Sequence, residues 1–195
     1  MTGSLAPVQG PPLRRLDRLI RSLRIRVVDP HLGSGVRVLD VGCFDGSLFA
    51  LYRARITHGI GIDPLLVANG EWAGFRFIKS PFPSSALDGQ RFDVITMLAV
   101  LEHVPANDLD QWREACEALL EPGGRLIATV PSPRVDDILH LFGRLRLVEG
   151  IAAHEHHGFD PEDLPPILSS GGLAVSEHRR FELGLNHLFV FTKRE

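Results

Sequence analysis

Short apolar segments alternate with helix-forming segments from residue 36 onward, and this alternation constrains the fold more than any other feature of the chain. The segments with the length and composition of strands are 36–41, 57–62, 75–78, 92–98, 125–130, 173–181 and 186–192. Strands separated by helices form βαβ units. The pattern therefore predicts an α/β fold with a doubly wound, mostly parallel sheet of seven strands.

The last two strand segments predict a different connection. Only residues 182–185 lie between segment 173–181 and segment 186–192. A crossover between parallel strands needs a dozen or more residues, whereas antiparallel strands can be joined by a short turn. We therefore expect the sheet to end in an antiparallel hairpin.

Composition excludes several classes of protein. The formal net charge of the 195-residue chain is -3, so no global positive field would gather nucleic acid. Two cysteines, Cys43 and Cys116, are too few for a disulfide framework. No apolar run reaches the length of a membrane-spanning helix, and the first dozen residues lack the apolar core of a secretion signal. We expect a soluble, cytoplasmic protein and leave its oligomeric state open.

The N-terminal region, residues 1–30, reads as a loose tail followed by a basic amphipathic helix, with the main domain at 31–195. Apolar residues recur at helical spacing from Leu13 to Leu23, and arginines lie between them. One interpretation is an outer helix whose arginines face solvent. The other is a surface that meets acidic lipid or an acidic partner. Asp17 and the short length favour the first, so peripheral membrane contact is the weaker interpretation.

Two strand ends carry residues typical of a ligand site, because ligands bind outside the carboxyl ends of strands in such sheets. The first strand ends in Asp40-Val-Gly-Cys-Phe-Asp-Gly46, where Gly42 lets the backbone turn sharply and approach a ligand. A plain strand-to-helix turn is the alternative. Asp63 ends the second strand about 20 residues further on, a spacing typical of a carboxylate that binds ribose hydroxyls. A helix cap before Pro64 is the alternative. Together the two ends indicate an adenosine-containing ligand.

The chemistry of the first loop favours S-adenosylmethionine over NAD. Dinucleotide sites use G-x-G-x-x-G, and this loop lacks that spacing. Asp40 and Asp45 would repel a pyrophosphate but suit a ligand with an ammonium and a sulfonium group.

Four segments in register carry a family resemblance: VLDVGCFDG (38–46), GIDP (61–64), FDVITMLAVLEHV (92–104) and LEPGGRLIATVP (120–131). They resemble the successive motifs of class I S-adenosylmethionine-dependent methyltransferases, most closely the small-metabolite branch that includes enzymes of ubiquinone and menaquinone biosynthesis. The resemblance implies a Rossmann-like sheet, S-adenosylmethionine as cofactor and a small-molecule methyl acceptor.

The resemblance also implies which residues contact the cofactor. Asp40, Gly42, Cys43, Phe44 and Gly46 would surround its methionine end, Asp63 would bind the ribose, Pro64 and Ser80 would lie near the adenine, and Leu98 and Ala99 would lie along the amino-acid part. Phe44 departs from the family, which has a glycine there. Ser80 stands where many members have an acid.

Methyl transfer needs an aligned acceptor, and a base only if the acceptor loses a proton. The candidates for that base are His103, His156 and His157, since histidine titrates near neutral pH. His103 could instead belong to a helix-entry turn. The run 154–158 (HEHHG) could instead bind a metal, but no cysteine or spaced carboxylate pair completes a site there, so we expect none.

The acceptor is the least constrained part of the sequence reading. Segment 134–157 is expected to be a lid that favours an apolar or aromatic acceptor, although a helix packed on the core edge is the alternative. Residues 98–101 lack the Asn/Asp-Pro-Pro-aromatic tetrad of the family's amide- and base-methylating members. O-, C- and N-methylation of a small metabolite stay open. A non-catalytic cofactor-binding protein and, less favoured, an NAD-linked oxidoreductase are the alternatives.

Overall fold

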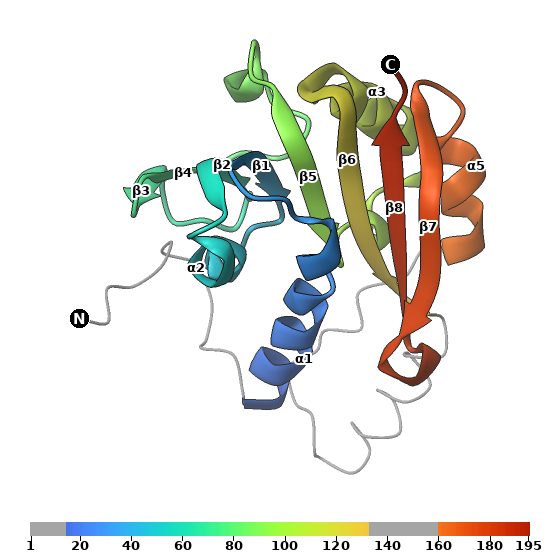
Figure 1. The fold of residues 1–195 in the computed structure, drawn as a ribbon, viewed down its shortest axis with the longest axis horizontal. Coiled ribbons are helices and arrows are strands. Elements are labelled where there is room, and N and C mark those ends of the chain that lie inside the picture. The colour runs from blue at the N-terminus through green and yellow to red at the C-terminus, as the bar shows by residue number, and fades with distance from the viewer. Residues whose placement is uncertain (1–14, 133–159) are drawn as a thin grey trace.

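The computed structural model describes residues 15–132 and 160–195, with side chains from residue 20 onward. These residues form one mixed sheet of eight strands in the order β3-β4-β2-β1-β5-β6-β8-β7, with helices on both faces (Figure 1). The strands are β1 (Val36–Val41), β2 (Ile56–Ile62), β3 (Gly70–Trp72), β4 (Phe75–Ile78), β5 (Phe92–Leu98), β6 (Leu120–Pro131), β7 (Leu173–Phe181) and β8 (Asn186–Lys193).

Strand directions confirm the predicted α/β fold. Strands β4, β2, β1, β5 and β6 run parallel to one another, whereas β8 runs antiparallel between β6 and β7. The expected C-terminal hairpin is therefore present. The expected number of seven strands is wrong, because β3 adds an eighth by antiparallel pairing with β4. The sequence does not indicate β3, because three residues are too few to show an alternating pattern. The strand forms by pairing with the free edge of β4.

The α-helices of the described residues are α1 (Arg15–Arg26), α2 (Ser47–Tyr52), α3 (Leu109–Leu119) and α5 (Leu164–Leu168). Asp108 precedes α3 without capping it. Residues Ala106–Asp108 form a separate 3-10 turn, and Asp108 has right-handed helical backbone angles and makes no side-chain capping bond. A capping side chain normally needs an extended backbone, which this preceding turn prevents.

Two apolar layers hold the helices on opposite faces of the sheet. On one face, Leu109 and Cys116 of α3 and Leu164 of α5 share a core with alternate strand residues. On the other face, Ile25 and Val28 pack with Val38 and Ile127. Helix α1 therefore packs on the sheet, as an outer helix would (Figure 1).

Candidate functional site

The loop after β1 has a backbone that only some residues tolerate. Gly42 has φ of 72°, Phe44 of 49° and Gly46 of 73°. A Cβ built on Gly42 would lie 2.5 Å from Cγ2 of Val100. Gly42 is thus needed twice, for its left-handed backbone and for the close approach of the segment after β5. Phe44 adopts the left-handed conformation in spite of its side chain, where the family has glycine.

Asp63 fastens this loop to the end of β2. Its carboxylate is buried and accepts hydrogen bonds from the amides of Phe44 (2.9 Å) and Leu65 (2.8 Å). Each carboxylate oxygen has a further lone pair, so the group can accept additional donors. Pro64 lies exposed beside it. The geometry holds a carboxylate at the point where a ligand at the carboxyl ends of β1 and β2 would meet it.

Asp40, in β1, is the second buried carboxylate of the site. Its Oδ1 accepts a hydrogen bond from the hydroxyl of Thr96 in β5 at 2.7 Å. Burial raises the pKa of Asp40 to about 7, the charges of Asp63 and Asp45 act in the same direction, and the Thr96 bond and Arg21 oppose the rise. A cationic ligand nearby would favour the ionised form.

Arg21 of α1 closes over the loop, and the sequence analysis did not select it. Its Nη2 donates to the carbonyl oxygen of Cys43 (3.2 Å) and lies 2.9 Å from Asp45 Oδ1, and its guanidinium stacks over the Phe44 ring at 4.6 Å. The sequence shows a basic helix but not which arginine points at the loop. That choice depends on how Ile25 and Val28 seat the helix on the sheet.

The side chains of two other predicted contact residues, Cys43 and Ser80, have partners within the protein. The thiol of Cys43 is buried against Gly61, where a Cβ would lie 2.7 Å from Sγ, and burial raises the pKa of this thiol well above its usual range. Only the backbone of Cys43 can therefore face a ligand. Ser80 shares a hydrogen bond of 3.0 Å with Ser84.

At the end of β5, Leu98 and Ala99 are half-buried beside the loop. Ala99 has φ of 57°, and its amide donates to the carbonyl oxygen (2.9 Å) and the hydroxyl (3.1 Å) of Thr129. Non-glycine residues in this conformation cluster at functional sites.

The candidate bases have different positions. His103 is exposed at the end of a 3-10 turn, Leu101–His103. His156, His157 and the expected lid 134–157 lie outside the described residues, so their roles stay predictions. The neighbouring Glu102, which the sequence analysis did not select, is buried, and burial raises its pKa to about 7.

Glu102 belongs to a polar cluster, which we define as Arg24, Glu102, Glu182 and Asn186; Glu102 and Asn186 are buried, and Arg24 and Glu182 are half-buried. Four of its atoms have no hydrogen-bond partner among the described residues: Arg24 Nε, Glu102 Oε2, Glu182 Oε1 and Asn186 Oδ1. Asn186 donates to the other oxygen of Glu182, and Arg24 attracts both carboxylates. Buried polar atoms without partners are unfavourable by about 1–3 kcal/mol each. The polar cluster is therefore suited to a polar ligand, one helical turn from Arg21.

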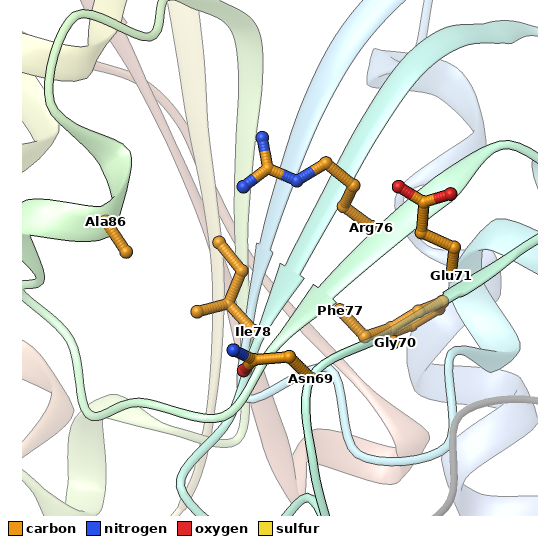
Figure 2. Close-up of a pocket in the computed structure, with 7 residues that line it drawn as sticks. All are labelled: Asn69, Gly70, Glu71, Arg76, Phe77, Ile78 and Ala86. Atoms are coloured by element: carbon orange, nitrogen blue, oxygen red, sulfur yellow. The ribbon is translucent and has the colours of Figure 1, made fainter.

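A separate cavity lies at the opposite edge of the sheet. It has a volume of about 380 Å³ and is lined by Asn69, Gly70, Glu71, Arg76, Phe77, Ile78 and Ala86. Figure 2 shows Arg76 and Ile78 on the side of β4 that faces Ala86, with Glu71 on the adjoining strand β3. None of the predicted site residues lines this cavity, but the carbonyl oxygen of its lining residue Ile78 accepts hydrogen bonds from the amides of Asp63 and Ser80, both at 3.1 Å.

This sheet order, with a glycine loop after β1 and a carboxylate at the end of β2, defines an α/β methyltransferase-type domain. A family model described as "Methyltransferase domain" matches residues 13–178. The chain therefore belongs to the methyltransferase-domain family of class I, S-adenosylmethionine-dependent enzymes, as its motifs predicted.

Curated relatives have similar sequences over part of their length. The ubiquinone biosynthesis O-methyltransferase of Pseudomonas aeruginosa (strain UCBPP-PA14) is 36% identical over 118 residues, which cover 55% of this chain and 50% of the relative. The enzyme of the same name from Acinetobacter baylyi is 29% identical over 175 residues, covering 81% of this chain and 72% of the relative. The chain thus spans about half of the first relative.

Solved structures share the fold. The 1,6-didemethyltoxoflavin-N1-methyltransferase of Burkholderia thailandensis, solved with its namesake ligand and S-adenosylhomocysteine, has a TM-score of 0.64 at 20% identity, covering 97% of this chain and 94% of that one. The N-methyltransferase NodS of Bradyrhizobium japonicum WM9 has a TM-score of 0.65 at 14% identity, covering 93% and 98%. Within the described residues, no helix is long and apolar enough to cross a membrane.

Proposed function

We propose that this protein transfers a methyl group from S-adenosylmethionine to a small-molecule acceptor. The observation that carries the proposal is the convergence of Asp40, Asp63 and Arg21 on one loop at the carboxyl ends of β1 and β2. Two buried carboxylates and one arginine match a ligand that carries an ammonium, a ribose diol and a carboxylate.

On the donor side, each residue has a distinct role in this proposal. Asp63 accepts from the ribose hydroxyls through its remaining lone pairs. Asp40 stabilises the positive end of the methionine part, and Arg21 donates to its carboxylate. Leu98 and Ala99 border the same space, and Pro64 and Ser80 lie on the adenine side. The bound donor supplies an activated methyl carbon, so the chain has only to align the acceptor behind it.

On the acceptor side, the polar cluster holds four buried polar atoms that have no hydrogen-bond partner among the described residues. Glu102 lies three residues after Ala99, at the end of β5 nearest the donor loop. A carboxylate with a pKa of about 7 is suited to accept a proton from an acceptor hydroxyl, because a general base works best with a pKa near the working pH. We therefore rank Glu102 above His103 as the base, while His156 and His157 stay open.

Among the three open reactions we favour O-methylation, which the relatives' names support. Those relatives are named for ubiquinone biosynthesis, and an acceptor with an apolar or aromatic body and a hydroxyl group fits both that similarity and the polar cluster. The acceptor's identity and the cytoplasmic location stay predictions of the sequence.

The experiment is a two-stage assay. Calorimetry with S-adenosylmethionine, S-adenosylhomocysteine and NAD measures binding first. Release of S-adenosylhomocysteine is then followed with a panel of phenols, catechols, carbon acids and amines. We expect the two adenosyl ligands to bind, NAD to give no heat, and a hydroxylated aromatic to be turned over.

Matched variants make the assay decisive. Asp63→Asn should abolish donor binding, while Glu102→Gln should keep donor binding and lose turnover. Binding of NAD instead of S-adenosylmethionine would contradict the proposal. Donor binding without turnover of any acceptor would favour the non-catalytic alternative.

A further inference from the structure

Three potential metal ligands lie close together at the β8–β7 edge of the sheet, away from the donor loop after β1. Glu162, in the turn before α5, lies with His178 of β7 and His187 of β8 so that one ligand atom of each is within 4.8 Å of the others. The two imidazoles are closest, with Nε2 of His178 3.0 Å from Nδ1 of His187. This separation is that of a hydrogen bond between the two rings. Two ligands of a tetrahedral Zn²⁺ ion, each at about 2.1 Å, are separated by about 3.4 Å, so the rings would exchange this bond for the ion by moving about 0.4 Å apart.

The packing around these residues holds the imidazoles in place. His178 stacks on Phe189 with ring centroids 4.2 Å apart and an angle of 17° between the planes. His187 is only 3% exposed and faces Val130 across the β6–β8 ladder. Ligands fixed before binding lose little side-chain entropy when an ion arrives.

The charges around His187 are mixed. Arg180 and His178 have the larger effect on its imidazole, and Glu162 and Asp160 act in the opposite direction. Arg180 pairs with Oε1 of Glu162 at 3.3 Å, but both side chains are more than half exposed, so this ion pair contributes little. A carboxylate has two oxygens, and one can bind a cation while the other keeps the arginine.

We propose that Glu162, His178 and His187 form a binding site for a borderline divalent cation such as Zn²⁺. Two imidazoles and one carboxylate suit Zn²⁺, Co²⁺ or Ni²⁺, whereas Mg²⁺ and Ca²⁺ prefer oxygen ligands alone. Three protein ligands leave a coordination position open to water.

The proposed cation site lies away from the donor loop and does not rest on the proposed function, and His187 follows Asn186 of the polar cluster in β8. Strand β8 lies three positions from β1 in the sheet, roughly 14 Å at ordinary strand spacing. The bound ion would tie the turn before α5 to the terminal hairpin. Sequence reasoning missed it because it considered only 154–158 as a metal site, whereas His178 and His187 meet through strand pairing.

The test uses the full-length protein without a histidine tag. Zn²⁺ affinity is measured by competition with a chromophoric chelator, and Co²⁺ is added to read the coordination from its visible absorption. We expect one equivalent of Zn²⁺ to bind, a higher thermal midpoint with Zn²⁺ than without it, and no effect of Mg²⁺.

Variants locate the ion. His178→Gln, His187→Gln and Glu162→Gln should each weaken Zn²⁺ binding at least tenfold (about 1.4 kcal/mol). Asp163→Asn, in the same turn as Glu162, and His58→Gln, on the distant strand β2, are matched controls that should not. Circular dichroism and S-adenosylmethionine affinity report whether each variant is folded.

Two results would overturn the inference. One is the absence of stoichiometric Zn²⁺ binding to the wild-type protein. The other is Zn²⁺ binding that survives in the three ligand variants and disappears when His154, His156 and His157 are replaced together.

Discussion

At the scale of single residues, the candidate site depends on a few side chains whose partners come from distant parts of the chain. Arg21 reaches the loop after β1 from α1, and Thr96 bonds Asp40 from β5. Removing one such side chain should change ligand binding more than folding, because these groups contribute few apolar contacts to the core.

Arg21 is the first residue to test. Replacing it with alanine removes the guanidinium from the carbonyl of Cys43 and from the Phe44 ring. We expect S-adenosylmethionine affinity to fall about tenfold or more, since a charge-assisted hydrogen bond contributes about 1.5–3 kcal/mol. Arg26→Ala, exposed on the same helix, is the control. Equal calorimetric affinities for the two variants would remove Arg21 from the site.

Gly42 is the second residue to test. Alanine at this position meets Cγ2 of Val100 and is forced into a left-handed backbone, which together should destabilise the protein by about 2 kcal/mol or more. Adding Val100→Ala should restore the steric part and leave about 1 kcal/mol of backbone strain. Chemical denaturation of the single and double variants measures both parts. A Gly42→Ala protein as stable as wild type would show that the loop can relax.

At the scale of secondary-structure elements, the C-terminal hairpin also completes α3. Lys193 at the end of β8 donates from Nζ to the carbonyl oxygens of Glu117 (2.6 Å), in the last turn of that helix, and of Leu120 (2.7 Å), the residue that follows it. A cation is favourable at a helix C-terminus, where carbonyl groups lack partners within the helix. The hairpin thus stabilises a helix far from it in the sequence.

Lys193→Met tests this coupling. The methionine keeps the apolar stem but not the two donors, so we expect the free energy of unfolding to fall by about 2 kcal/mol with S-adenosylmethionine affinity unchanged. Arg194→Met, exposed next to it, should change stability by less than about 0.5 kcal/mol. Indistinguishable denaturation curves for the two variants would show that solvent replaces the lysine without loss.

At the scale of the whole molecule, stability should depend on two buried carboxyls. Burial raises the pKa of both Asp40 and Glu102 to about 7, from ordinary values near 4. A carboxyl with a raised pKa stabilises the fold fully below its unfolded pKa, and this contribution is lost as pH rises through the folded value. The ligand-free protein therefore loses this stability between about pH 4 and pH 7.

The Asp40→Asn/Glu102→Gln double variant should lose less stability over that range than the wild type, by an amount on the order of a few kcal/mol. The measurement is the difference between the two proteins in thermal midpoint against pH. The depressed pKa values of His31 and His187 act in the opposite direction below about pH 6.5, but they are common to both proteins. Parallel curves would mean that neither carboxyl is neutral in the folded state.

The sequence by itself determined the order of most strands and helices along the chain and the terminal hairpin, because local periodicity and spacing specify these features. The resemblance of its motifs indicated the family, and the strand ends indicated Asp40, Gly42 and Asp63 as candidate site residues. Tertiary structure decided the rest: the short strand β3, the choice of Arg21, the polar cluster around Glu102 and the meeting of His178 with His187. Arg21 meets Asp45, and Arg24 meets Glu102 and Glu182, across long stretches of chain, whereas β3 and the two histidines meet through strand pairing. Such contacts follow from strand register and helix seating, which local patterns of residues do not specify.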